Sequence, residues 1–111
     1  MEGMRVVGKL VELCAKDDVA EGEVVKVEKD GLELAVYHVE GEFYVTDDHC
    51  THGPGSLSEG HLDGHVIECD FHNGAFDIRS GAVVAPPCMV PVKTYKVIPN
   101  DGAVVIEVGE H

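Results

Sequence analysis

Short apolar stretches separated by glycine-containing turns restrict the fold of this chain more than any other feature. Asp30 with Gly31, and Glu40 with Gly41, each interrupt a stretch rich in valine, leucine and aromatic residues. An acidic residue followed by glycine, with an apolar stretch on each side, is typical of the tight turn of a β-hairpin. We therefore expect the first half of the chain to form antiparallel strands. The stretches in question are residues 24–27, 32–39 and 43–45.

The last quarter of the chain repeats this pattern. Residues 90–98 and 103–108 are rich in apolar residues, and a turn is expected between them at residues 100–102. No segment before residue 50 keeps a helical period over three turns, although residues 16–21 could form one turn. With 111 residues, the chain is expected to fold as a single all-β domain over residues 1–111, built from antiparallel sheets.

The segment between these two β-rich parts has a different composition. Six of the 13 glycines lie between residues 49 and 87, and five of the seven histidines lie between residues 49 and 72. Glycine and histidine in loops are poor material for a hydrophobic core, but they allow a backbone to fold closely around a group that is not protein. We expect an inserted binding subdomain at about residues 47–87.

Two Cys/His pairs in this subdomain form the candidate site. Cys50 and His52 can face one point because residues i and i+2 of an extended loop project to the same side. Cys69 and His72 can also converge, because residues i and i+3 of a tight turn approach each other. Two thiolates and two imidazoles on two loops predict a site for a thiophilic metal centre.

The spacing alone leaves two kinds of metal centre open. Tetrahedral zinc accepts two cysteines and two histidines, and such a site would make the chain a zinc-binding interaction module. Common zinc fingers, however, pair cysteine with cysteine and histidine with histidine along the chain, whereas each loop here supplies one of each. The alternative is a pair of irons bridged by sulfide, in which one iron binds both cysteines and the other binds both histidines.

The chain resembles the Rieske iron–sulfur family in its ligand motif. This motif consists of Cys-X-His, a spacer of 16 residues, and Cys-X-X-His followed two residues later by glycine. Asp70 is a departure, because the family usually has proline there. The wider likeness is to the small soluble Rieske ferredoxins of bacterial aromatic-ring-hydroxylating dioxygenase systems. It extends over nearly the whole chain and includes residues 17–23, 41–45, 56–60, 76–81 and 91–95.

The resemblance implies a Rieske fold and one [2Fe–2S] cluster per chain, with Cys50 and Cys69 on one iron and His52 and His72 on the other. It implies a one-electron carrier that is not itself an enzyme. The carrier would accept electrons from a flavin-dependent NAD(P)H reductase and pass them to a terminal Rieske oxygenase that hydroxylates aromatic compounds. A Rieske-type subunit held permanently in a larger reductase or hydroxylase is the alternative.

The resemblance also implies a reduction potential at the low end of the Rieske range, which spans about −150 to +300 mV. High-potential relatives carry an additional cysteine in each loop and a serine that donates a hydrogen bond to a bridging sulfide. The corresponding positions here are Gly55, Phe71 and Gly74, so this chain can form neither the disulfide nor that hydrogen bond. Fewer hydrogen bonds to sulfur stabilise the reduced state less.

Charge restricts the partners. The chain has 21 acidic and 8 basic residues and a net charge of −13, and it has no lysine or arginine between residues 30 and 78. Such a charge disfavours nucleic acid and anionic membranes; it favours a monomer in solution, and it could also steer a basic partner onto the acidic surface. No apolar stretch is long enough to span a bilayer and we find no signal-peptide pattern, so a cytoplasmic protein is expected.

The other cysteines and histidines are not expected to bind the metal. Cys14 and Cys88 are interpreted as small apolar residues, and Cys88 belongs to a proline-containing loop that in the family shields the cluster. His49 has the wrong parity to face the site, and His61 and His65 are expected on the surface. Leu57 and Phe71 could limit the access of water to the site or could simply pack. His38 and His111 suggest no site.

Overall fold

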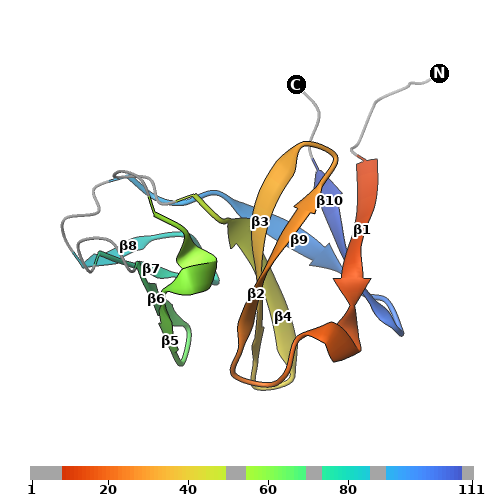
Figure 1. Cartoon of the computed structure of the whole chain (residues 1–111), viewed down its shortest axis with the longest axis horizontal. Helices are drawn as coiled ribbons and strands as arrows, with labels where there is room; N and C mark the ends of the chain where they lie inside the picture. The colour runs from red at the N-terminus through yellow and green to blue at the C-terminus, as the bar shows by residue number, and fades with distance from the viewer. Residues whose placement is uncertain (1–8, 50–54, 70–73, 86–89, 109–111) are drawn as a thin grey trace.

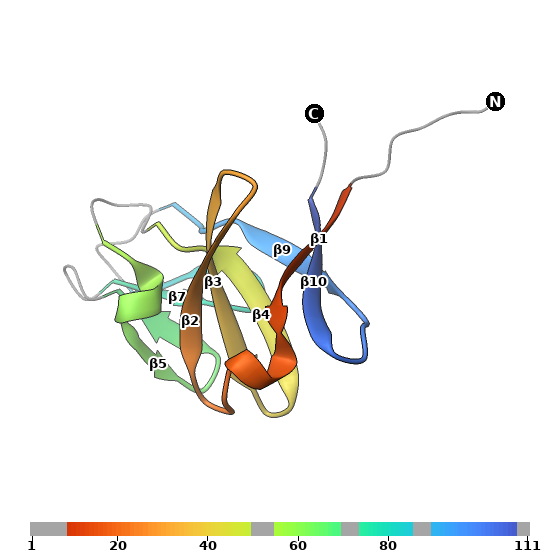
Figure 2. The same cartoon turned by 45° about the vertical axis from the view of Figure 1, so that its right-hand side comes forward.

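The computed structural model describes residues 9–49, 55–69, 74–85 and 90–108. Within these residues it has ten β-strands and two 3₁₀ turns, and it has no α-helix. Figures 1 and 2 both show a smaller sheet lying to one side of a larger one. The strands are β1 (Lys9–Ala15), β2 (Val24–Lys29), β3 (Leu32–Val39), β4 (Glu42–Asp47), β5 (His61–Asp63), β6 (Val66–Glu68), β7 (Ala75–Asp77), β8 (Val83–Ala85), β9 (Thr94–Ile98) and β10 (Ala103–Val108).

The larger sheet has six antiparallel strands in the order β1-β10-β9-β4-β3-β2. Its two tight hairpins form where the sequence predicts them. Asp30 and Glu40 have φ values of 53° and 54°, and the glycines that follow have 81° and 79°. Two successive residues with positive φ give a turn whose twist matches that of the paired strands, and glycine adopts the second position without steric cost. The 3₁₀ turn η1 (Lys16–Asp18) follows β1.

The smaller sheet is formed by one continuous part of the chain that lies between β4 and β9. Its four strands are three residues each and pair antiparallel in the order β5-β6-β7-β8. The 3₁₀ turn η2 (Leu57–Glu59) leads into it from the larger sheet. This arrangement is the antiparallel all-β architecture with an inserted subdomain that the sequence predicts.

Strand β3 packs against two cores, one on each of its faces. Leu34 and Val36 point into a cluster with residues of β1, β4, β9 and β10, inside the curved larger sheet. Ala35 and Tyr37 point to the opposite side, into a cluster with the smaller sheet. Because alternate side chains of a strand face opposite sides, this double burial explains why residues 34–37 form an uninterrupted apolar run.

One expected strand is shorter than predicted, and several strands were not predicted. Residues 90–93 precede β9 instead of belonging to it. The N–H of Val92 donates to the carbonyl of Gly81 at 3.0 Å, and the Val92 side chain is buried in the core beside the smaller sheet. These residues therefore connect the two sheets. Strand β1 and the four strands of the smaller sheet are elements that the apolar pattern did not reveal.

The helical content also bears on membranes. Among the described residues there is no helix with the length and apolar character needed to cross a bilayer. The single turn considered for residues 16–21 is present as η1, over three residues.

Candidate metal centre

Cys69 lies directly after β6 and is the one predicted ligand whose surroundings the structure describes. It is fully buried, in the same cluster as Leu57, Ile67 and Phe76. Its N–H donates to the carbonyl of Gly74 at 2.7 Å. This hydrogen bond joins the residues on either side of residues 70–73, so the two ends of the second predicted ligand loop are held together at the end of the β6–β7 hairpin.

The two ends of the first predicted ligand loop are joined in a similar way. His49 and Ser56 form an isolated antiparallel bridge. The N–H of Leu57 donates to the carbonyl of Asp48 at 2.7 Å. The bridge and the hydrogen bond enclose the segment that contains Cys50 and His52, and they attach it to the end of β4.

Packing brings the borders of the two loops into one region. Leu57 follows the first loop and Cys69 precedes the second, and both are fully buried in one cluster. Gly60 allows the close approach that this requires, because a Cβ atom there would lie 2.0 Å from the carbonyl oxygen of Glu68. No residue with a side chain fits at such a distance. Glycine at position 60 thus sets the spacing between η2 and β6.

The end of the third loop of the subdomain lies near the second. Ala85, the last residue of β8, pairs with Ala75, which directly follows Gly74. Residues 86–89 begin at this point of the small sheet. The described residues therefore place the borders of all three loops of the subdomain together, which is the arrangement required if they are to surround one group.

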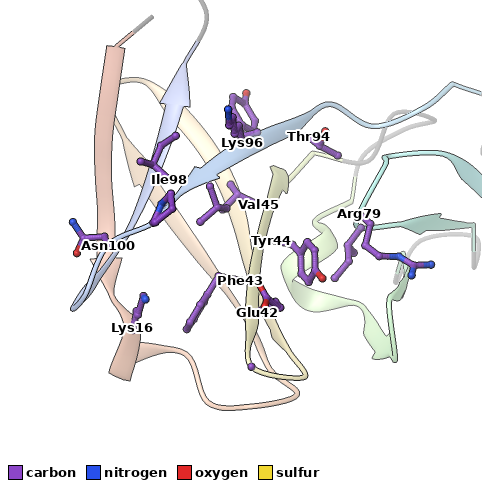
Figure 3. Close-up of a pocket in the computed structure, with 15 residues that line it drawn as sticks. Lys16, Glu42, Phe43, Tyr44, Val45, Arg79, Thr94, Lys96, Ile98 and Asn100 are labelled. Atoms are coloured by element: carbon purple, nitrogen blue, oxygen red, sulfur yellow. The ribbon is translucent and has the colours of Figure 1, made fainter.

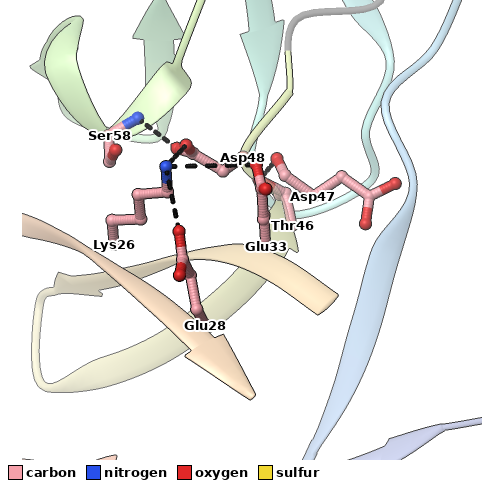
Figure 4. A network of polar contacts seen from close by, with 7 residues as sticks. All are labelled: Lys26, Glu28, Glu33, Thr46, Asp47, Asp48 and Ser58. Atoms are coloured by element: carbon pink, nitrogen blue, oxygen red, sulfur yellow. Dashed lines mark hydrogen bonds and ion pairs between the residues drawn. The ribbon is translucent and has the colours of Figure 1, made fainter. Parts of the chain in front are cut away.

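A polar network lies at the border of the first loop (Figure 4). Asp48 is 1% exposed and is the only buried acidic or basic side chain among the described residues. One of its carboxylate oxygens accepts the N–H of Ser58 at 2.7 Å, and the other lies 3.8 Å from the ammonium group of Lys26. Lys26 also contacts Glu28 at 3.4 Å and Glu33 at 3.9 Å. The hydrogen bond that Lys26 donates to the Glu28 carboxylate is the main reason why the pKa of Lys26 is raised.

Neighbouring residues of β4 are fixed by two tyrosines. The hydroxyl of Tyr37 lies 2.9 Å from the hydroxyl of Thr46, which donates to the carbonyl of Asp47 at 2.8 Å. The hydroxyl of Tyr95 donates to the Asp47 carboxylate at 2.6 Å. Burial raises the pKa of both tyrosines, and for Tyr95 the bond to Asp47 adds to the increase. Both tyrosines therefore stay protonated and hold the end of β4 in place.

Several residues singled out in the sequence lie outside the described residues. Cys50, His52 and His72 are among them, so their role as ligands stays a prediction. The same holds for the residue that departs from the family pattern and for the shielding loop. These positions are Asp70, Phe71 and Cys88.

The described histidines agree with the prediction in part. His49 and His61 are exposed. His65 lies at the surface but is only partly exposed, because it packs edge-on against Tyr44 with ring centroids 5.6 Å apart. His38 stacks on Phe43 at 4.1 Å.

Leu57 and Cys14 both have packing positions. Leu57 is fully buried, with 0% of its surface exposed to solvent, so the described structure favours its packing role. Cys14 is half-buried against the core of the larger sheet, and burial raises the pKa of its thiol. A higher pKa keeps the thiol protonated and unreactive at neutral pH, as expected for a cysteine without a chemical role.

A groove lies elsewhere on the molecule (Figure 3). It has a volume of about 670 Å³ and is lined by residues of β4 and β9, with Phe43 and Tyr44 among them. Lys16 and Arg79 also line it. None of the described residues that border the predicted ligand loops lines this groove, so it is separate from the candidate metal centre.

Comparison with known proteins decides between the metal centres. Residues 9–96 match the Rieske [2Fe–2S] domain. The chain belongs to the Rieske family. It is 51% identical over 104 residues to the ferredoxin component of the p-cumate 2,3-dioxygenase system of Pseudomonas putida, which covers 92% of this chain and 88% of the relative. It is 46% identical over 89 residues to the ferredoxin component of the naphthalene 1,2-dioxygenase system of Pseudomonas putida, covering 80% and 86%.

Solved structures agree with this assignment. The Rieske ferredoxin of Sphingomonas yanoikuyae B1 has a TM-score of 0.85 and 48% identity, and the match covers 89% of this chain and 98% of that one. A chain in the complex of reduced oxygenase and oxidized ferredoxin in carbazole 1,9a-dioxygenase has a TM-score of 0.84 and 43% identity, over 92% and 95%. This chain is a Rieske ferredoxin, an electron carrier and not an enzyme.

The donor set of the chain fits the iron–sulfur cluster of this family. Two cysteines and two histidines, with one of each in either predicted loop, are the donor types that a Rieske centre requires. The burial of Cys69 among apolar side chains limits the access of water to the sulfur atom of this predicted ligand. The residues that the sequence did not identify are Asp48 and Lys26. Asp48 lies two positions before Cys50, but no sequence signal shows that it is buried or that Lys26 approaches it.

Proposed function

We propose that this Rieske ferredoxin carries single electrons in a bacterial aromatic-ring-hydroxylating dioxygenase system. One [2Fe–2S] cluster per chain would be bound by Cys50 and Cys69 on one iron and by His52 and His72 on the other. The cluster supplies a one-electron redox couple. The chain's own residues bind it, bury Cys69 and join the ends of both loops, so that the donors are held in place in either redox state.

The single observation that carries this proposal is the convergence of the two loop borders. The His49–Ser56 bridge and the bond from Cys69 to Gly74 fix the two loops, and the close contact at Gly60 brings them together. A four-donor site with one Cys/His pair on each loop needs this convergence. The identity to ferredoxin components of dioxygenase systems, at 51% and 46%, supports the same function.

The proposed partners are a flavin-dependent NAD(P)H reductase as electron donor and a terminal Rieske oxygenase as acceptor. A relative at 43% identity is found in a complex of oxygenase and ferredoxin, which supports the second partner. We propose a monomer that acts in the cytoplasm, where NAD(P)H is available to the reductase. The net charge of −13 supports the monomer, since like-charged molecules repel each other in solution.

We also propose a low reduction potential. Gly74 accepts the Cys69 N–H through its carbonyl and has no hydroxyl group to donate to sulfur. The reduced state therefore lacks one source of stabilisation that high-potential Rieske proteins have. Such a potential suits the transfer of electrons from a nicotinamide-linked reductase to an oxygenase.

The test uses the full chain, purified without air. We expect acid-labile sulfide and iron in a ratio of one, at two of each per chain, and an electron paramagnetic resonance signal after reduction that shows coupling to nitrogen. Coupling to nitrogen identifies histidine ligands, and Cys-only clusters lack it. A colourless protein with one zinc per chain would overturn the proposal, because zinc has no redox chemistry.

The partner assignment has a separate test. The reduction rate by a dioxygenase-system reductase, and the oxidation rate by its oxygenase, are measured at increasing salt. If the acidic surface guides docking, both rates should fall as salt rises, since exposed charges are screened beyond about 10 Å at 0.1 M salt. Elution as a single chain in size-exclusion chromatography is expected, and a stable complex with a larger protein would instead support a permanent subunit.

A further inference from the structure

We propose that Asp48 is a positioning residue for the first ligand loop, and that its charge, balanced by Lys26, helps to set the reduction potential. This inference rests on the proposed function, because it assumes that Cys50 and His52 bind the cluster. It concerns two residues that no part of the ligand motif includes. The two roles, holding the loop and setting the potential, can be measured separately.

Asp48 lies at the base of the first ligand loop. Its N–H donates to the carbonyl of Glu33 at 2.9 Å, which fixes it to β3. Its carbonyl accepts the N–H of Leu57 at 2.7 Å, and its carboxylate accepts the N–H of Ser58 at 2.7 Å. Asp48 therefore uses its backbone and its side chain to join the two ends of the segment that contains the first Cys/His pair.

The side chain of Asp48 is buried. An ionised carboxylate that is 1% exposed costs free energy unless it is hydrogen-bonded or paired. The Ser58 N–H satisfies one oxygen, and the Lys26 ammonium group, at 3.8 Å, lies near the other. A neutral residue would be easier to bury, so the retention of a charge at this point calls for a role beyond packing.

The cation beside Asp48 comes from a distant part of the chain. The chain has no lysine or arginine between residues 30 and 78, so no permanently charged cation of this segment can balance Asp48. Strand β2 of the larger sheet supplies Lys26 instead, as Figure 4 shows. Lys26 is held at this place by Glu28 and Glu33 as well as by Asp48. The pair therefore links the larger sheet to the base of the ligand loop.

The charge of Asp48 can reach the cluster because of its short separation from a ligand. Two residues of extended chain span at most about 7 Å, so the Cα atoms of Asp48 and Cys50 lie within that distance. Charges at such a separation interact more strongly inside a protein than in water. A negative charge there disfavours the addition of an electron, and the positive charge of Lys26 offsets it.

The test measures the midpoint potential of the cluster-loaded protein by spectroelectrochemistry. Asp48→Asn keeps an oxygen that can accept the Ser58 N–H but removes the negative charge, so the potential should rise. Lys26→Met removes the balancing charge and should lower the potential. The double variant should return close to the wild-type value. Asp63→Asn and Lys29→Met are matched controls, because both residues are exposed and Lys29 lies on the same strand as Lys26; their shifts should be smaller.

A second measurement tests the positioning role. The decay of the visible absorption in the presence of an iron chelator gives the rate of cluster loss. Asp48→Ala leaves the Ser58 N–H without its acceptor, and we expect loss of the cluster on the order of tenfold faster than in the wild type. Asp48→Asn should restore most of the retention, because its amide oxygen can replace the carboxylate oxygen.

The outcomes separate this inference from the proposed function. A wild-type protein without acid-labile sulfide would overturn the proposed function. A normal wild-type cluster, with shifts of the same sign in Asp48→Asn and Lys26→Met or shifts no larger than the controls, would overturn only the charge role. Equal rates of cluster loss in Asp48→Ala and wild type would overturn the positioning role. If Asp48→Ala does not fold, the other two variants still decide the charge role.

Discussion

The two sheets of this protein differ in what stabilises them. The larger sheet has strands of five to eight residues. It also has a core of its own, to which strands from one edge of the sheet to the other contribute. The smaller sheet has strands of three residues, and its core is completed by β3 of the larger sheet. Strands of three residues have few ladder hydrogen bonds, so the smaller sheet depends on packing against its neighbour.

This difference suggests a division of roles. The larger sheet can be regarded as a frame that forms from its own sequence, while the ligand-bearing half is shaped by contacts with that frame. Tyr37 and Leu57 belong to such contacts, because they lie in the shared cluster. Substitutions of core residues in the ligand-bearing half should therefore affect the cluster, and comparable substitutions in the core of the frame should affect only stability.

The largest effect is expected from Cys69→Ser. Replacing a proposed ligand should abolish the cluster, with loss of the visible absorption bands, while far-ultraviolet circular dichroism still reports the strands of the larger sheet. Cys14→Ser is the matched control, because Cys14 packs against the frame core, and it should keep the full absorption. A cluster that survives in Cys69→Ser would remove this residue from the ligand set.

Leucine substitutions compare the two cores directly. Leu34 and Leu57 are both fully buried, at 0% exposure to solvent, and each belongs to a different core cluster. Changing either residue to alanine should lower the free energy of unfolding by about 3 kcal/mol. Only Leu57→Ala should also speed cluster loss, measured by absorption in chelator. Equal rates of cluster loss in both variants would contradict the division of roles.

A smaller effect is expected from Gly60→Ala. The added Cβ would lie 2.0 Å from the Glu68 carbonyl oxygen, so η2 and β6 must move apart. We expect a loss of about 2 kcal/mol in the free energy of unfolding by denaturant titration, together with a shifted resonance spectrum of the reduced cluster. Gly102→Ala in the frame has nothing within 4 Å and should change neither quantity.

The smallest effect concerns a contact within the frame and depends on pH. The Glu21 carboxylate accepts the N–H groups of Gly41 and Glu40, at 3.0 and 2.6 Å, and these bonds lower its pKa. A lowered pKa in the folded state gives stability that is present above the unfolded pKa and is lost as pH falls through the folded value. Glu21→Gln should thus be slightly less stable than wild type at pH 7.

The measurement is the free energy of unfolding of both proteins from pH 7 down to pH 3. The difference should shrink as pH falls below about 4.5, the usual value for this carboxyl group. Glu23→Gln, an exposed residue two positions on, is the control. The reduction potential should not change in either variant. A difference that persists unchanged at pH 3 would contradict the assignment to the carboxylate.

Much of the frame could be predicted from the sequence. Strands β3 and β10 have the predicted bounds, because their apolar residues are bordered by turns whose residues favour positive φ or a side-chain bond to the backbone. At the second kind of turn, the Asn100 side chain accepts the N–H groups of Gly102 and Ala103. Because neighbouring residues determine such turns, the turns can be predicted from the sequence.

The smaller sheet could not be predicted in the same way. A strand of three residues, such as β6 or β7, is too short to show a period of two. Residues 90–93 have the composition of a strand, but the Val92 N–H pairs with Gly81 and not with a neighbouring strand. The smaller sheet packs against β3, which lies far away in the sequence, and only the folded chain brings the two together.

The sequence by itself determined the turns of the frame and the type and spacing of the four proposed donors, because both depend on neighbouring residues. Only the tertiary structure decided that Asp48 is buried and that Lys26 lies beside it. Burial and charge pairing depend on which strands meet in space. A chain whose ligand-bearing segment contains no lysine or arginine obtains its balancing cation from another strand, and composition alone does not reveal which one.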